Sequence, residues 1–181
     1  RKILTYMILF IALIESVAIY GLVVWTQILW TLDINGYIAI WAWLAIWLAW
    51  LWVWVGEGIL SAYSMDVIWK NSKMHSTFLT TTILWVALAE SAAIYGLVIA
   101  FQVLGLAPEM AIAWLWAGAA IGLAALWAGI WEWMLVGGTF ISMYRNPSLK
   151  SRDLAFMVLF LALIEVLAIY GLIVAFQILS K

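Results

Sequence analysis

Long apolar segments, separated by short polar ones, limit what this chain can fold into. A helix needs about 20 mainly apolar residues to cross a bilayer. Five segments meet that requirement: 3–30, 37–63, 77–104, 109–143 and 153–179. Of the 181 residues, 69% are hydrophobic and only 9% are charged, so water could not solvate the surface of a domain made from them. We therefore predict an all-α membrane protein with five transmembrane helices.

The charges between these segments predict an orientation. Basic side chains occupy the N-terminus and the loops after the second and fourth segments: Arg1, Lys2, Lys70, Lys73, Arg145, Lys150 and Arg152. The other two loops contain Asp33 and Glu109. Because cytoplasmic loops carry an excess of Lys and Arg, we expect the basic loops in the cytoplasm and the chain in a bacterial-type plasma membrane. The formal charge of −1 argues against nucleic acid as a partner and leaves membrane lipid as the expected surroundings.

A repeat of 75 residues divides the chain. ALIESVAIYGLVV from Ala12, ALAESAAIYGLVI from Ala87 and ALIEVLAIYGLIV from Ala162 align without gaps. The second and fourth segments repeat with the same offset and carry Glu57 and Glu132. The unit is therefore an antiparallel helical hairpin in tandem copies. We predict three parts, the first being the second helix of a truncated hairpin: 1–33, 34–108 and 109–181.

Residues 41–54 contain six tryptophans, and several of them align with glycine in the next copy of the repeat. Tryptophan and glycine exchange in both directions: Trp43, Trp47 and Trp54 align with Gly118, Gly122 and Gly129, and Gly56 and Gly58 align with Trp131 and Trp133. Glycine allows helices to approach closely, and a packed interior does not absorb its exchange with the largest side chain. Our hypothesis is that most of these tryptophans are mis-decoded glycines, from a gene in which UGA means glycine. Trp69 and Trp85 align with aromatic residues and are expected to be genuine.

With glycine restored, residues 40–58 read IGAGLAIGLAGLGVGVGEG, and the chain resembles the rotor-ring proteolipid of rotary ATPases, the c subunit of F-type enzymes or its V/A-type counterpart. In that family a glycine-rich inner helix faces the ring axis, and an outer helix carries an ionisable carboxyl. The resemblance implies a ring of copies of the chain that turns against an a-type stator subunit. It also implies a polar loop that contacts the central stalk. Arg145, Asn146 and Pro147 match that loop, and Lys70 and Asn71 match it less well.

Each outer helix carries a glutamate about halfway along its span: Glu15, Glu90 and Glu165. An ionisable side chain in the middle of a membrane is costly and points to an ion pathway. Facing lipid, the carboxylate must be neutralised by a proton or a bound cation; facing a polar channel in the stator, it can exchange that ion. We therefore expect Na⁺ or H⁺ as the transported ion and no other cofactor.

The resemblance to sodium-binding rings implies further ligands. They are the inner-helix carboxyls, hydroxyls beside the outer glutamates, and carbonyls two residues before them: Glu57, Glu132, Ser16, Ser91, Tyr20, Tyr95, Tyr170, Leu13, Leu88 and Leu163. On this pattern Glu57, Glu90 and Ser91 form the best candidate sodium site. Val166 replaces the serine in the third copy, which weakens the expectation of sodium beside Glu165. Two carboxyls in one site could instead share a proton, and both ions remain open.

The expected function is that of an ion-carrying rotor subunit, which forms no covalent intermediate because catalysis belongs to the soluble ATPase head. Two alternatives remain. One is a Trp-rich structural or designed transmembrane bundle without transport activity. The other is a small secondary transporter, which the parallel repeats disfavour because such transporters commonly contain inverted repeats.

Overall fold

The computed structural model describes residues 2–30, 36–71, 73–105 and 111–180. Five long helices account for nearly all of them: α1 Lys2–Trp30, α2 Gly36–Lys70, α3 His75–Leu104, α4 Ala111–Arg145 and α5 Lys150–Leu179. A short 3₁₀ turn, η2, covers Pro147–Leu149, and these described ranges contain no strand. All five helices are long and apolar enough to cross a membrane. The predicted fold class is therefore confirmed.

Helices α2 and α5 extend beyond the apolar segments that predicted them. The second segment was expected to end at 63, but α2 continues to Lys70. Lys70 Nζ lies 2.5 Å from Asp66 Oδ2, one helical turn earlier. Such i,i+4 pairs support a helix after the apolar run has ended, so polarity marks the end of the apolar segment but not the end of the helix. In the same way, α5 begins at Lys150, before the predicted 153, and carries Asp153 in its first turn.

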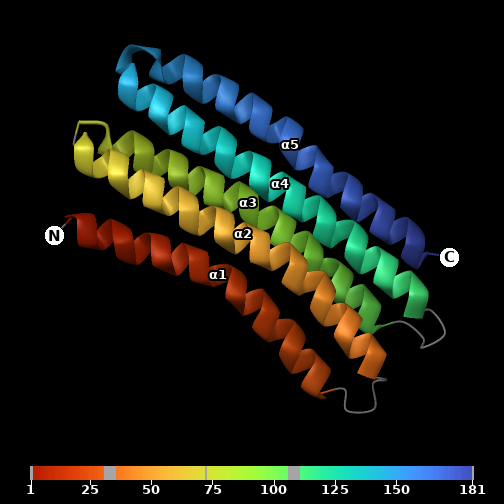
Figure 1. Cartoon of the computed structure of the whole chain (residues 1–181). Coiled ribbons are helices and arrows are strands. Elements are labelled where there is room, and N and C mark those ends of the chain that lie inside the picture. Colours follow the sequence, from red (N-terminus) through yellow and green to blue (C-terminus); the bar gives the residue numbers. More distant parts are fainter. Residues whose placement is uncertain (1, 31–35, 72, 106–110, 181) are drawn as a thin grey trace.

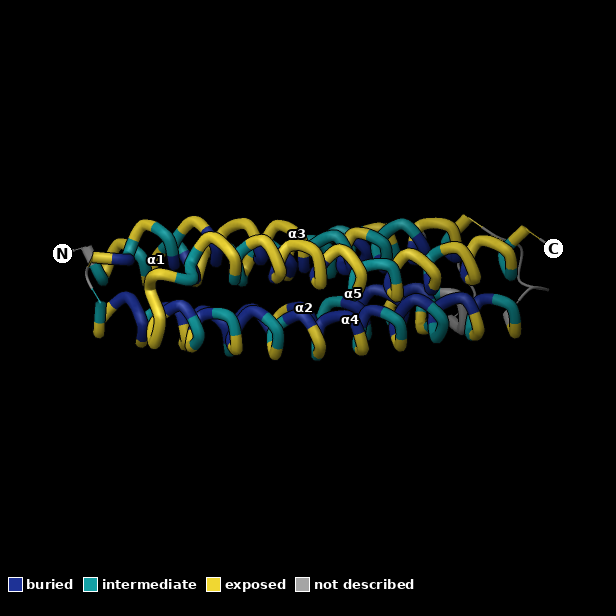
Figure 2. The backbone as a smooth tube through the Cα atoms, turned by 90° about the horizontal axis from the view of Figure 1, so that it is seen from above, coloured by how far each residue is buried: buried dark blue, intermediate teal, exposed yellow. Residues whose placement is uncertain are grey.

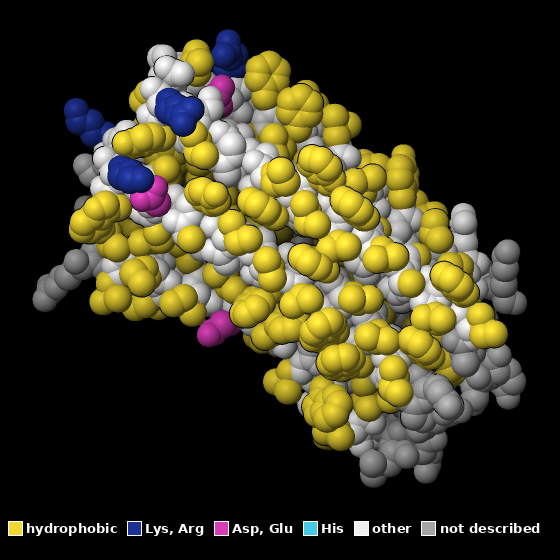
Figure 3. Space-filling model, in the orientation of Figure 1, with side chains coloured by type: hydrophobic (Ala, Val, Ile, Leu, Met, Phe, Trp, Pro, Cys, Tyr) yellow, Lys and Arg dark blue, Asp and Glu magenta, His cyan; other side chains and the backbone are white. Residues whose placement is uncertain are grey.

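The helices form two layers. Figure 2 shows α1 and α3 in one layer and α2 and α4 in the other, while α5 packs against α4 and also contacts α3. The start of α1 and the α2–α3 and α4–α5 turns lie at one end of the bundle (Figure 1). Charged side chains gather at that end, and apolar side chains cover most of the face shown in Figure 3. Arg1, Asp33 and Glu109 lie outside the described residues, so the predicted charge difference between the two ends is not tested.

Small residues set the spacing within each hairpin. A Cβ atom added to Gly96 on α3 would lie 2.6 Å from the Cβ of Ala49 on α2. Gly171, at the matching position of α5, meets α4 in the same way, with a Cβ 2.9 Å from the Ala120 carbonyl oxygen. Gly21 is the counterpart on α1, where an added Cβ meets nothing within 4 Å. In each of the two hairpins, the backbones of the two helices therefore approach closely at one glycine, Gly96 in the first and Gly171 in the second.

Glycines of α4 make the contact between α2 and α4 similarly tight. An added Cβ at Gly122 would lie 2.8 Å from the Cβ of Leu48, and one at Gly118 would lie 3.4 Å from the Cβ of Ala45. The counterparts of these glycines on α2 are Trp43 and Trp47, which stack on each other with ring centroids 5.4 Å apart. Trp43 is exposed. The same repeat position is therefore a close helix contact on α4 and a bulky surface on α2.

Candidate ion-binding site

Four of the five predicted intramembrane glutamates meet in pairs between the layers. Glu57 on α2 is 0% exposed and Glu132 on α4 is 2% exposed, whereas Glu90 and Glu165 are half-buried on α3 and α5. Glu57 and Glu90 stand at similar separations from the α2–α3 turn, so closing the hairpin brings them to the same depth. Each inner carboxyl has the outer carboxyl of its own hairpin as an electrostatic neighbour. The fifth glutamate, Glu15, is exposed on α1, and no described residue hydrogen-bonds to it.

Serine hydroxyls reach these carboxyls from the neighbouring outer helix. Ser16 Oγ on α1 donates to Glu90 Oε1 on α3, and Ser91 Oγ on α3 donates to Glu165 Oε1 on α5. The structure therefore pairs Ser91 with Glu165 rather than with Glu90, and sodium binding by Glu57, Glu90 and Ser91 stays a prediction. Glu165 has a hydroxyl partner although Val166 follows it, because that partner belongs to α3. Consecutive helical residues do not face the same neighbour, so a glutamate and the next residue serve different interfaces.

Two further groups from α1 accompany Ser16. Its Oγ lies 2.6 Å from the carbonyl oxygen of Leu13, one of the predicted carbonyl ligands. Tyr20 is half-buried, and the acidic neighbours that act on its hydroxyl are Glu90 and Glu57. The structure thus brings together oxygen atoms from α1, α2 and α3. Leu13, Ser16 and Tyr20 belong with Glu90 rather than with Glu15.

Several carboxyl oxygens are buried without a hydrogen-bond partner among the described residues. They are both oxygens of Glu57 and Oε2 of Glu165. Buried polar atoms are normally paired, and a bound proton or cation would satisfy these. Beside the second pair, a cavity of about 330 Å³ is lined by Glu132 and Glu165 and otherwise by apolar side chains, Leu88 among them. The carboxyls therefore border a space that a small ion could occupy.

The remaining predicted residues are less involved in these pairs. Tyr95 is half-buried on α3, whereas Leu163 and Tyr170 are exposed on α5. The predicted stalk-contacting residues all lie at the end of the bundle that carries the two described turns: Lys70, Asn71, Arg145, Asn146 and Pro147. All except the half-buried Asn71 are exposed. Their contact with a stalk stays a prediction.

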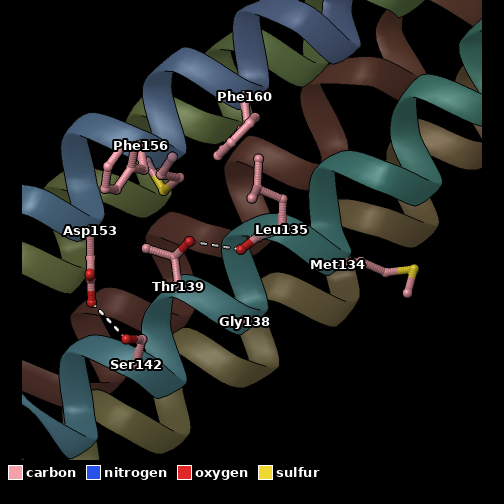
Figure 4. Close-up of a pocket in the computed structure, with 9 residues that line it drawn as sticks. Met134, Leu135, Gly138, Thr139, Ser142, Asp153, Phe156 and Phe160 are labelled. Carbon is pink, nitrogen blue, oxygen red and sulfur yellow. Dashed lines mark hydrogen bonds between the residues drawn. The ribbon is translucent and has the colours of Figure 1, made fainter.

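Sequence reasoning missed two polar links near the turn end. Ser64 Oγ and Thr82 Oγ1, both buried, lie 2.5 Å apart across α2 and α3. Ser142 Oγ donates to Asp153 Oδ2 over 2.7 Å across α4 and α5. In Figure 4 these two groups point toward each other at the edge of a cavity of about 410 Å³, which is also lined by Phe156. Polar residues flanking each turn were the available signal, but the sequence does not say which of them pair.

Comparison with known proteins agrees with the repeated site. The profile of the ATP synthase C-subunit family matches the chain twice, over residues 40–103 and 115–178. The ATP synthase c subunit of Carboxydothermus hydrogenoformans is 38% identical over 65 residues, which are 36% of this chain and 79% of that relative. The protein of the same name from Bacillus thuringiensis is 40% identical over 65 residues, which are 36% of this chain and 90% of that relative. Each profile match contains one inner and one outer glutamate of the pairs above, and the chain belongs to the ATP synthase C-subunit family.

Proposed function

We propose that this chain is an ion-carrying subunit of the rotor ring of a rotary ATP synthase. The observation that carries the proposal is the repeated pair of intramembrane carboxyls, Glu57 with Glu90 and Glu132 with Glu165, each reached by a hydroxyl from the neighbouring outer helix. Carboxyls at this depth are rare, costly and typical of ion pathways. Family membership supports the same role.

The proposed mechanism has two states of each outer glutamate. While the glutamate faces lipid, a bound cation or proton neutralises the carboxyl, because a bare charge there is too costly. When the ring carries it to an a-type stator subunit, the carboxyl exchanges its ion with a polar channel. Rotation of copies of the chain past the stator then couples ion flow to the central stalk. The exposed turn residues Arg145 to Pro147 are the proposed stalk contact, on the cytoplasmic side of the membrane.

For the site at Glu90 we propose Na⁺ as the transported ion. The Ser16 hydroxyl, the Leu13 carbonyl and the Glu90 carboxyl form a contiguous set of oxygen atoms beside Glu57. Hard cations prefer oxygen ligands. Of the two carboxyls, one neutralises the cation and the other must be protonated, because two like charges so close cannot both remain ionised cheaply.

A proton is the second candidate, and one contact favours it. A serine hydroxyl carries a single hydrogen, and Ser16 Oγ is in contact with both the Leu13 carbonyl and Glu90 Oε1. If the hydroxyl donates to the carbonyl, a protonated Glu90 can donate to Ser16 Oγ. The same geometry then describes a proton-loaded site without any metal ion.

Labelling with a hydrophobic carbodiimide tests both levels of the proposal. The reagent modifies protonated carboxyls within the membrane, and peptide mapping identifies the modified residues. We expect modification of Glu90 and Glu165, slowed by Na⁺ but not by K⁺. If Na⁺ does not slow the modification, the proposal that Na⁺ is the transported ion is overturned, and the proton remains as the candidate. A chain that reacts at no glutamate at any pH would contradict ion carrying itself, and the Glu90→Gln variant gives the background at that position.

A further inference from the structure

A line of buried polar side chains runs along α2 from the inner carboxyl toward the α2–α3 turn. Glu57, Ser61 and Ser64 are 0%, 7% and 0% exposed, respectively. Steps of four and three residues place them on one face of the helix, over about 10 Å of its length. Ser64 Oγ lies 2.5 Å from Thr82 Oγ1 of α3, so the line ends at a pair of hydroxyls between two helices, which we call the hydroxyl pair.

The packing of α2 against α3 brings an indole to the same depth as Ser61. Ser61 and Trp85 each lie three residues from the hydroxyl pair, on the side away from the turn. Equal steps from a shared contact keep residues of antiparallel helices level. Trp85 is 0% exposed, and a Cβ atom added to Gly56 would lie 3.6 Å from its Cη2 atom. The ring of Trp85 therefore lies against the segment of α2 that carries Glu57 and Ser61.

Several buried polar atoms in this segment have no hydrogen-bond partner among the residues that the structure describes. They are both carboxyl oxygens of Glu57, Ser61 Oγ and Trp85 Nε1. A proton on Glu57 does not satisfy them, because its O–H group also needs an acceptor, and a metal ion does not satisfy an indole N–H, which can only donate. A water molecule both donates and accepts, and buried waters typically make about three hydrogen bonds to otherwise unpaired groups.

The contact between α2 and the indole also leaves room for a molecule of that size. The nearest neighbours of a Cβ atom added to Gly56 would be Trp85 Cη2 and Trp133 Cδ1, both at 3.6 Å. These are ordinary contact distances, so one more heavy atom fits there without displacing either ring. Water has a single heavy atom.

The α4–α5 hairpin lacks this polar line, although it has the same fold. The residues that replace Ser61, Thr82 and Trp85 in the repeat are Val136, Met157 and Phe160, respectively. None of the three replacements carries an N–H or O–H group in its side chain. Glu132 therefore has apolar side chains at the repeat positions where Glu57 has two hydroxyls and an indole N–H.

We propose that water bound between α2 and α3 links the carboxyl of Glu57 to the hydroxyl pair, and that Glu57 exchanges its proton through this link toward the α2–α3 turn. Each group of the link accepts one proton and passes another on, so none keeps an additional charge. Glu132 has no equivalent link, and the two inner glutamates therefore exchange protons at different rates. The use of this exchange in ion transport rests on the proposed function, but the water and the exchange can be measured without it.

Brief X-ray irradiation tests for the water, because bound water yields hydroxyl radicals that oxidise the side chains beside it. In the full chain in lipid vesicles, peptide mass mapping should find Trp85 oxidised, although its side chain is 0% exposed. Phe140 is equally buried, lies among apolar side chains and should stay unmodified. If Trp85 stays unmodified at a dose that oxidises the exposed Tyr144, the bound water is overturned.

Infrared spectroscopy measures the proton exchange itself. The C=O band of a protonated carboxyl shifts when deuterium replaces the proton, and Glu57→Gln identifies the band of Glu57 by its loss. We expect Ser61→Val to slow this exchange about tenfold, the change that corresponds to one lost hydrogen bond, and to leave the band of Glu132 unchanged. Trp85→Phe should act in the same direction, because it removes the N–H group and keeps an aromatic ring. Valine and phenylalanine occupy these positions in the α4–α5 hairpin, so a helix pair of this kind accommodates both.

The outcomes separate this inference from the proposed function. If Ser61→Val and Trp85→Phe leave the exchange rate of Glu57 unchanged while Glu90 still reacts with carbodiimide and responds to ions, the inference fails and the proposed function stands. If both variants slow the exchange but carbodiimide modifies no glutamate, the water link stands and the proposed function fails. Exchange of Glu132 as fast as that of Glu57 would also overturn the inference, since the polar line would then make no difference.

Discussion

Three glycines at one repeat position allow a quantitative test of the packing. Alanine at Gly96 would place its Cβ 2.6 Å from the Cβ of Ala49 and 3.2 Å from the carbonyl oxygen of Ala45. Neither neighbour can rotate away, because one is a Cβ and the other is backbone. Overpacking costs about 1–3 kcal/mol, and the unyielding neighbours favour the upper end of that range. The helix propensity of alanine offsets about 1 kcal/mol, so Gly96→Ala should lower the free energy of unfolding by about 2 kcal/mol.

Gly21 provides the matched control, since an added Cβ there meets nothing within 4 Å. In Gly21→Ala only the higher helix propensity of alanine should matter, and it should raise the free energy of unfolding by up to about 1 kcal/mol. Gly171→Ala should resemble Gly96→Ala, because its Cβ would lie 2.9 Å from the Ala120 carbonyl oxygen. Reversible unfolding of the purified full chain in mixed micelles, followed by circular dichroism, measures all three. Equal stability of the Gly96 and Gly21 variants would refute the close contact of α2 with α3.

Two further predictions concern the inner helices and the buried hydroxyls. Peptides that cover residues 40–58 of the natural protein should carry glycine at the positions written Trp43, Trp47 and Trp54, and their codons should be UGA. The reason is that the matching face of α4 leaves no room for a Cβ atom at Gly122. UGG codons and tryptophan in the peptide would reject the decoding hypothesis. Ser64→Ala should lower the free energy of unfolding by about 1 kcal/mol, because it removes the hydrogen bond between the hydroxyls of residues 64 and 82. Thr82 still donates to the Phe78 carbonyl oxygen over 2.7 Å. The exposed Ser148→Ala should stay within about 0.5 kcal/mol of the parent, and equal effects of these two substitutions would show that the buried link contributes nothing.

Most of the fold follows from the sequence because a bilayer permits few alternatives. Apolar length alone predicts five helices, and the 75-residue repeat predicts that they form tandem hairpins. The ends of the helices were less predictable. Asp66 and Lys70 are polar, and hydropathy alone assigns them to a loop, yet their pairing continues α2 to its end.

The sequence does not say which of the predicted site residues lie together. Glu90 and Ser91 are neighbours in sequence, and the resemblance to sodium-binding rings assigned them to one site. Side chains one residue apart on a helix point about 100° away from each other. Glu90 therefore meets α1 while Ser91 meets α5. The sequence predicts the direction in which each side chain leaves its helix axis. It does not predict which neighbouring helix lies in that direction.

The hydrogen bonds that serine donates to glutamate run from α1 to α3 and from α3 to α5, which gives the row of outer helices a direction. In both described links, a serine of one outer helix donates to the glutamate of the next outer helix along the chain. A body that moves along such a row meets the donor helix before the helix that carries the carboxyl in one direction of travel, and after it in the other. In the proposed rotation, forward and reverse turning would therefore present the serine donor and the carboxyl to a stator in opposite order, even though the helices themselves repeat.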